Sequence, residues 1–145
     1  MIVAGAIGAS VILQKNRNSA KQPLESRQTV TEKTSSDQIK RYELYTPTLF
    51  TNTANKRRVL YFYATWCPSC KLADADFTAN ANNIPADAIV LRVNYNDPDT
   101  DNEEKKLART YGITYQHTFV QIDAQGKPLT TWNGGQTDDL VAKIQ

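Results

Sequence analysis

The chain has 145 residues, with 17 lysine or arginine against 15 aspartate or glutamate, which leaves a formal net charge of +2. This balance does not indicate a nucleic-acid-binding surface, so we expect no nucleic-acid partner. Two cysteines exclude the multi-bridge framework of a small secreted scaffold.

The chain begins with an uncharged, mostly apolar run at residues 1–13. A membrane-spanning helix needs about 20 apolar residues, so this run is short. Basic residues follow it at Lys15 and Arg17 rather than precede it. We expect a membrane anchor or a signal remnant, with a disordered or surface-lying tail as the alternative. Positive-inside reasoning alone would keep the rest of the chain in the cytoplasm.

Residues 14–36 are polar, mixed in charge and almost free of large apolar side chains. Such a segment cannot bury enough apolar surface to fold, so we expect a disordered linker. From residue 37 to residue 145, apolar runs alternate with turn signals. These residues are expected to form a single domain.

The pattern within residues 37–145 predicts an α/β fold with a central mixed β-sheet flanked by helices. The run RRVLYFYAT is typical of a strand buried on both faces. Gly112 and Thr137 suit a helix stop and a helix N-cap. Strands are predicted at 57–65, 88–95, 117–123 and 127–133, and helices at 68–81, 97–112 and 137–145, with a further helix allowed around 37–46.

Both cysteines, Cys67 and Cys70, lie in one short motif, with Pro68 and Ser69 between them. A disulfide closing so short a loop would stabilise the fold little. A zinc site needs about four ligands, more than two thiols and one histidine provide. Cys67 follows a predicted strand and starts a predicted helix, a place that favours a thiolate. We predict that Cys67 exchanges with a partner disulfide and that Cys70 resolves the mixed species.

The segment YFYATWCPSCK resembles the active-site segment of the thioredoxin superfamily. The similarity continues through LRVNYND and YGITYQHTFVQIDAQGK and extends over roughly residues 40–145. It implies a thioredoxin-like fold and a monomeric thiol–disulfide oxidoreductase that acts on protein thiols or disulfides without a bound cofactor. A separate redox partner would recharge it. Cys67 would be the exposed nucleophile and Cys70 the more buried thiol, with the surroundings shaped by Trp66, Pro68, His117 and Thr118.

The N-terminal run and linker are similar to the layout of membrane-tethered bacterial proteins of the TlpA-like extracytoplasmic type. That resemblance implies a location at the cell membrane, with the domain on the extracytoplasmic side. A cytoplasmic domain is the alternative. The direction of electron flow stays open, because it depends on how strongly the fold stabilises the thiolate.

The sequence departs from the family at the usual cis-proline, whose place is taken by His117. A cis bond before another residue costs about 3–4 kcal/mol. Three roles are open to His117: a cation that stabilises the Cys67 thiolate, a third metal ligand, or an ordinary loop residue. The second role supports an alternative function, a metal-binding or metal-delivery module that uses Cys67, Cys70 and His117.

A second departure places Tyr61 where many thioredoxins bury an aspartate. With a pKa near 10, tyrosine is a poor base at neutral pH. We expect Tyr61 to pack in the core with Tyr63, its hydroxyl near Arg92. The carboxylates of Asp74 and Asp76 are two residues apart on a helix, so we expect them on a solvated face.

Overall fold

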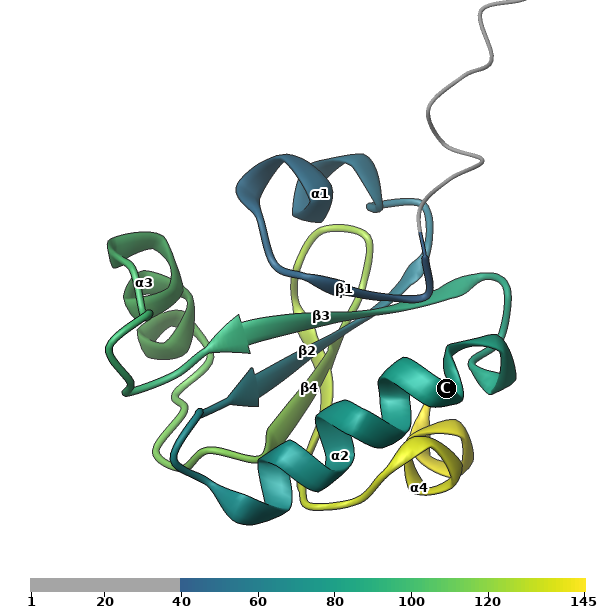
Figure 1. The fold of residues 1–145 in the computed structure, drawn as a ribbon. Coiled ribbons are helices and arrows are strands. Elements are labelled where there is room, and N and C mark those ends of the chain that lie inside the picture. The colour runs from purple at the N-terminus through teal and green to yellow at the C-terminus, as the bar shows by residue number, and fades with distance from the viewer. Residues whose placement is uncertain (1–39) are drawn as a thin grey trace, which may run out of the picture. The chain divides into compact units, whose positions relative to one another are not determined.

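The structure is a computed structural model that describes residues 40–145. The predicted anchor at 1–13 and linker at 14–36 lie outside the described residues. The strands are β1 (Tyr42–Leu44), β2 (Arg57–Tyr63), β3 (Ala88–Asn94), β4 (Thr118–Ile122) and β5 (Pro128–Asn133). The helices are α1 (Pro47–Asn52), α2 (Pro68–Ala79), α3 (Asn102–Thr110) and α4 (Thr137–Lys143), and a 3-10 turn, Ala81–Asn83, follows α2 (Figure 1).

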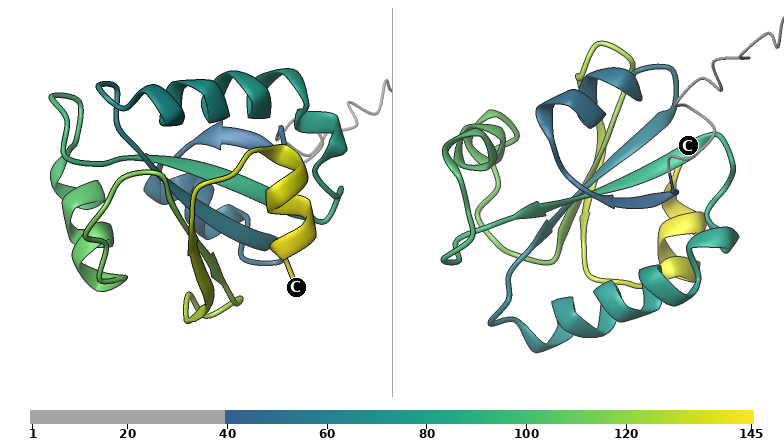
Figure 2. Two further views of the ribbon diagram at one scale, coloured as in Figure 1. Left: turned by 90° about the horizontal axis from the view of Figure 1, so that it is seen from below. Right: turned by 45° about the horizontal axis from the view of Figure 1, so that its top comes forward.

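The five strands form one mixed sheet in the order β1-β3-β2-β4-β5. Strands β1, β3 and β2 are parallel, and β4 and β5 run antiparallel to their neighbours. Helices α1 and α3 cover one face of the sheet, and α2 and α4 cover the other (Figures 1 and 2). The predicted α/β class and mixed, helix-flanked sheet are confirmed.

Strand β2 lies at the centre of the sheet and has apolar cores on both faces, as its unbroken apolar run predicts. Tyr61 and Tyr63 point to the α2 and α4 side, where they pack with Phe77 and Phe119. Leu60 and Phe62 point to the other side. The prediction that Tyr61 and Tyr63 are core residues is confirmed.

The start of the domain differs from the prediction, because the helix allowed around 37–46 is absent from the described part of that range. Strand β1 lies there instead, beside β3, and the helix begins only at Pro47. Thr46 is the N-cap, and its hydroxyl accepts the N–H of Leu49 at 3.0 Å. A residue that precedes proline avoids the helical region, so Pro47 begins this helix rather than ending one.

Two other helix starts are also corrected. Helix α3 begins at Asn102 rather than at 97, because Asp101 and Glu104 form a reciprocal capping box. Helix α4 forms as predicted, but its N-cap is Gln136, and Thr137 is the first helical residue. The expected stop at Gly112 is confirmed: α3 ends at Thr110, and Gly112 has a φ of 63°.

The prediction of a solvated face for Asp74 and Asp76 is wrong, since both carboxylates hold α2 against other elements. Asp74 accepts hydrogen bonds from the hydroxyl of Tyr42 and, at 2.8 Å, from the guanidinium of Arg92. Asp76 accepts the N–H and hydroxyl of Thr137 at 2.8 and 2.6 Å, and so caps α4. Two carboxylates on one helix therefore fasten it to three other elements, β1, β3 and α4.

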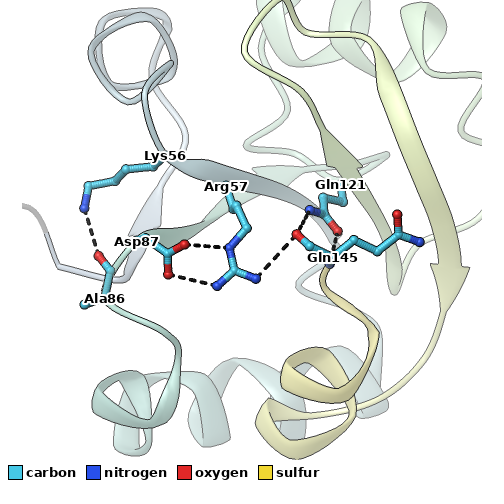
Figure 3. A network of polar contacts seen from close by, with 6 residues as sticks. All are labelled: Lys56, Arg57, Ala86, Asp87, Gln121 and Gln145. Atoms are coloured by element: carbon cyan, nitrogen blue, oxygen red, sulfur yellow. Dashed lines mark hydrogen bonds and ion pairs between the residues drawn. The ribbon is translucent and has the colours of Figure 1, made fainter.

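Polar contacts join the start of β2 to Asp87, just before β3, and to Gln145, at the end of the sheet opposite the cysteines (Figure 3). Gln121, on β4, is buried, and its side-chain amide pairs in both directions with the main-chain N–H and oxygen of Gln145 at 2.9 Å each. The guanidinium of Arg57 donates two hydrogen bonds of 2.8 Å to the carboxylate of Asp87.

No helix between residues 40 and 145 is both long and apolar enough to cross a membrane.

Candidate functional site

The two cysteines lie where β2 gives way to α2, at the point that the sequence predicts. Cys67 is the N-cap of α2 and Pro68 is its first residue, so proline occupies the position at which its missing N–H costs nothing. The structure joins Cys67 and Cys70 in a disulfide. Cys67 is 4% exposed and Cys70 is fully buried, which keeps the expected order of burial although Cys67 exposes little surface.

The sulfur of Cys67 accepts the main-chain N–H of Cys70 at 3.2 Å. This N–H is one of the donors that a helix start leaves without a partner inside the helix. In the reduced protein it would face a developing thiolate, as would the positive end of the helix dipole. Hydrogen bonds to a charged form favour that form, so this arrangement would stabilise a thiolate on Cys67.

His117 lies beside the cysteine pair rather than in a remote loop. One ring nitrogen of His117 and the sulfurs of Cys67 and Cys70 all lie within 4.8 Å of one another. The backbone of His117 has a φ of 58°, a left-handed conformation in which histidine is among the better tolerated residues. Its N–H donates to Phe62 at 2.7 Å and its carbonyl accepts from Gly134 at 2.8 Å, which fixes this conformation.

Both ring nitrogens of His117 have partners. Nδ1 lies 3.0 Å from the hydroxyl of Ser69, and Nε2 lies 3.1 Å from the carbonyl oxygen of Gly135. The same hydroxyl of Ser69 lies 3.3 Å from the sulfur of Cys67. No local pattern in the sequence marks Ser69 or Gly135, because only the folded chain brings them to the imidazole.

Trp66 precedes Cys67 and Thr118 follows His117, and neither side chain forms a hydrogen bond with the cysteines. The Thr118 hydroxyl donates to the carbonyl of Tyr115 at 2.8 Å and so braces the loop that carries His117. Trp66 is 52% exposed, and its ring N–H donates to the carbonyl of Asn96 at 2.9 Å. The exposed part of this indole supplies apolar surface near the start of α2.

Tyr61 reaches the site by a different contact from the one expected. Its hydroxyl donates to the main-chain carbonyl of Cys70 at 3.1 Å, while Arg92 pairs with Asp74. Burial raises the pKa of Tyr61 well above its ordinary value. The phenol is therefore neutral at physiological pH and cannot take up a proton from either cysteine, which agrees with the prediction that Tyr61 is a poor base.

The Cys67, Cys70 and His117 cluster offers three donor atoms for a metal, and no fourth histidine, cysteine or acidic ligand joins it within residues 40–145. Tetrahedral sites need about four ligands. The imidazole is also engaged at both nitrogens, with Ser69 and Gly135. The donor set therefore does not favour the metal-binding alternative.

Residues 43–145 match the family described as Thioredoxin. The chain belongs to the thioredoxin family. Thioredoxin H4 of Arabidopsis thaliana is 34% identical over 91 residues, which span 63% of this chain and 71% of that protein. Thioredoxin H2-2 of Oryza sativa subsp. japonica is 32% identical over 90 residues, 62% of this chain and 61% of the relative. The chain thus spans less than two thirds of this second relative.

Solved structures agree on the fold. The crystal structure of reduced Schistosoma mansoni thioredoxin pre-protein has a TM-score of 0.52 and 25% identity, covering 72% of this chain and 97% of that one. Trxlp of Edwardsiella tarda EIB202 has a TM-score of 0.56 and 21% identity, covering 72% of this chain and 98% of its own, a likeness of fold alone. The thioredoxin family and the Cys67–Cys70 pair support thiol–disulfide oxidoreductase activity.

Proposed function

We propose that this thioredoxin-family chain cycles between a Cys67–Cys70 disulfide and a dithiol by exchange with protein substrates. Cys67 is the nucleophile and Cys70 the resolving thiol. The observation that supports this assignment is the main-chain N–H of Cys70, 3.2 Å from the sulfur of Cys67 at the start of α2. This donor stabilises negative charge on Cys67, the sulfur that must act as the thiolate.

The exchange proceeds in two balanced steps. The Cys67 thiolate attacks one sulfur of a substrate disulfide, forming a mixed disulfide and releasing the other substrate sulfur as a thiolate, which takes up a proton. Cys70 loses its proton and attacks the sulfur of Cys67, which restores the Cys67–Cys70 disulfide and releases the second substrate thiol. Two electrons pass to the substrate, and the reverse sequence oxidises a substrate dithiol.

A hollow beside His117 is the proposed place for the substrate polypeptide. Its walls include Ser69 from the start of α2, the loop before β4 and the end of β5. Tyr115 in that loop is 70% exposed, and Trp66, the residue before Cys67, is 52% exposed, so both supply apolar contact surface. A protein disulfide bound in this hollow would present one of its sulfurs to Cys67.

The deciding experiment is a redox titration of residues 37–145 in glutathione buffers, with both thiols followed by labelling. A reversible two-electron transition is expected. A midpoint near about −270 mV would make the chain a reductant, and one near about −120 mV an oxidant. Cys67→Ala should abolish exchange, whereas Cys70→Ala should accumulate mixed disulfides on Cys67. Thr78→Ala, a hydroxyl loss on the outer side of α2, is the matched control. Full activity in Cys67→Ala would overturn the assignment.

We further propose that residues 1–13 anchor the protein to a membrane, that residues 14–36 form the linker, and that a monomeric domain faces the extracytoplasmic side in the TlpA-like manner. An uncharged apolar run followed by a polar segment of mixed charge supports this layout. A separate redox partner would recharge the cysteine pair. The test compares the full chain with residues 14–145 in a bacterial host by membrane fractionation and protease access. Equal partition of both forms into the soluble fraction would contradict the anchor.

A further inference from the structure

Three side chains form a continuous line of polar contacts at the active site. The Cys67 sulfur lies 3.3 Å from the Ser69 hydroxyl oxygen, which lies 3.0 Å from Nδ1 of His117. Nε2 of His117 then lies 3.1 Å from the carbonyl oxygen of Gly135. The imidazole reaches the sulfur of Cys67 by hydrogen bonds only through Ser69.

The carbonyl oxygen of Gly135, at one end of this line, determines which atoms along it carry protons. A carbonyl oxygen can only accept, so Nε2 of His117 carries a proton toward Gly135. In the neutral imidazole Nδ1 is therefore bare, and Ser69 donates its proton to that nitrogen. In the imidazolium Nδ1 donates to Ser69, whose hydroxyl is then free to donate to the sulfur of Cys67. The direction of the Ser69 hydrogen bond thus reports the charge of His117.

We propose that Ser69 relays a proton between Cys67 and His117, and that this relay is what activates Cys67 for exchange. The inference deepens the proposed function and rests on Cys67 being the nucleophile. In the dithiol form, the thiol of Cys67 gives its proton to the Ser69 oxygen as the Ser69 hydroxyl gives its own proton to Nδ1. The products are a thiolate, an intact serine hydroxyl and an imidazolium, with no net change in protons or electrons.

The imidazolium then stabilises the thiolate without contacting it. Ser69 donates one hydrogen bond to the sulfur and Cys70 donates another from its main-chain N–H, 3.2 Å away. Once the thiolate has attacked a substrate disulfide, the charge passes to the departing substrate sulfur, which can take up the proton held on His117. Within this scheme Ser69 touches the reacting sulfur, and His117 is a positioning residue that acts through it.

Other titratable groups around His117 come from three elements. Cys67 and Cys70 face it from α2, and Tyr61 faces it from β2 with ring centres 5.8 Å apart. Burial raises the pKa of Tyr61, so this phenol stays neutral across the range in which thiols titrate. Asp139, in the first turn of α4, packs against Gly135, the acceptor of Nε2.

The test measures how fast Cys67 is alkylated at each pH in the reduced protein, with the modified cysteine identified by peptide mapping. Ser69→Ala should raise the apparent pKa of Cys67 by about one unit, the size of a hydrogen bond to a charged group. Ser69→Thr keeps a hydroxyl and should restore most of the shift. Thr78→Ala, on the same helix, should change nothing.

His117→Asn completes the design, because asparagine tolerates a positive φ but cannot take up a proton. It should raise the apparent pKa of Cys67 as much as Ser69→Ala does. The double variant should raise this pKa little further, since both changes break the same line of hydrogen bonds. Coincident wild-type and Ser69→Ala profiles would overturn the relay. So would additive shifts, or a Ser69→Ala shift with no counterpart in His117→Asn.

A second readout needs no substitution at His117, the only histidine in the chain. The pH dependence of its imidazole resonances should differ between the dithiol and disulfide forms of the wild type, and much less so in Ser69→Ala. Equal differences in both proteins would overturn the relay. Exchange with a protein disulfide is measured separately. At pH 6, exchange by Ser69→Ala should be only about threefold slower than exchange by the wild type. The variant has a smaller thiolate fraction, but its less stabilised thiolate is more nucleophilic and offsets part of the loss. Normal alkylation profiles with no exchange would instead reject the proposed function.

Discussion

The hydroxyl of Tyr61 donates a 3.1 Å hydrogen bond to the main-chain carbonyl of Cys70. This contact links the central strand β2 to the first turn of α2, at the resolving cysteine. Burial raises the pKa of Tyr61, so the hydroxyl keeps its proton and this hydrogen bond persists around neutral pH. Tyr61 thus supports the cysteine pair mechanically and takes no part in proton transfer.

We predict that Tyr61→Phe lowers the free energy of unfolding by about 1 kcal/mol, the value of one neutral hydrogen bond. The rate of exchange with a protein disulfide should stay within about threefold of the wild type. Tyr61→Leu also removes the ring stacked 4.5 Å from Phe119 and should cost about 2–4 kcal/mol. Urea unfolding and an exchange assay measure both effects. A tenfold loss of exchange by Tyr61→Phe at unchanged stability would make the phenol a catalytic group.

The hydrogen bonds of Asp76 make part of the folding stability depend on pH in the acid range. Its carboxylate accepts the N–H and hydroxyl of Thr137 at 2.8 and 2.6 Å, and these bonds lower its pKa. A carboxyl whose folded pKa is lowered contributes stability that is complete above its unfolded pKa of about 3.9 and is lost as the pH falls through the folded value. We predict that Asp76→Ala lowers the free energy of unfolding by about 1–2 kcal/mol at pH 7.

The difference between Asp76→Ala and the wild type should shrink as the pH falls below about 4, because the wild type then loses the same contribution. Chemical unfolding between pH 2 and pH 7 measures this difference directly. Asp138→Ala, an exposed neighbour in the first turn of α4, should show a smaller and flatter effect. A difference that stayed constant across the whole range would show that Asp76 acts by packing and not by its charge.

Short-range relationships in the sequence predicted much of this molecule. Cys67 and Cys70 are three residues apart, so their motif and their place between a strand and a helix were visible before folding. Ser69 and His117 are separated by 48 positions, and nothing local shows that the two meet. Strand β1 has three residues and takes its structure from pairing with β3 rather than from its own pattern. Asp74 and Asp76 were misplaced because their partners, Arg92 and Thr137, come from distant elements.

The structural role of Arg58 could not be predicted from the sequence either, because this residue occurs in a strand whose pattern is apolar. Its guanidinium is buried and donates to the carbonyl oxygens of Phe50, Asp123 and Ala124 at 2.8, 2.6 and 3.0 Å. It also lies over the ring of Phe50, 4.6 Å from its centre. One side chain therefore ties α1 to the turn between β4 and β5.

We predict that Arg58→Lys lowers the free energy of unfolding by about 1–3 kcal/mol, because a lysine ammonium cannot reproduce the planar fork that bonds three carbonyls. Arg57→Lys is the matched control on the neighbouring residue. Its partner Asp87 is exposed to solvent, so the control should lose less stability. Equal losses in the two variants would show that the three carbonyl bonds contribute nothing specific.

The buried amide of Gln121 joins β4 to the main chain of Gln145. It donates to the main-chain oxygen of Gln145 and accepts its N–H, at 2.9 Å in each case, so it holds the segment after α4 against β4 (Figure 3). Gln121→Leu keeps the volume but removes both bonds, and should lower the free energy of unfolding by about 1–2 kcal/mol. The amide of Gln145 should then exchange its hydrogen faster, because water replaces the lost acceptor. Gln125→Ala, in the exposed turn after β4, should leave both measurements unchanged. Unchanged hydrogen exchange at Gln145 in Gln121→Leu would mean that the Gln121 amide does not hold this segment.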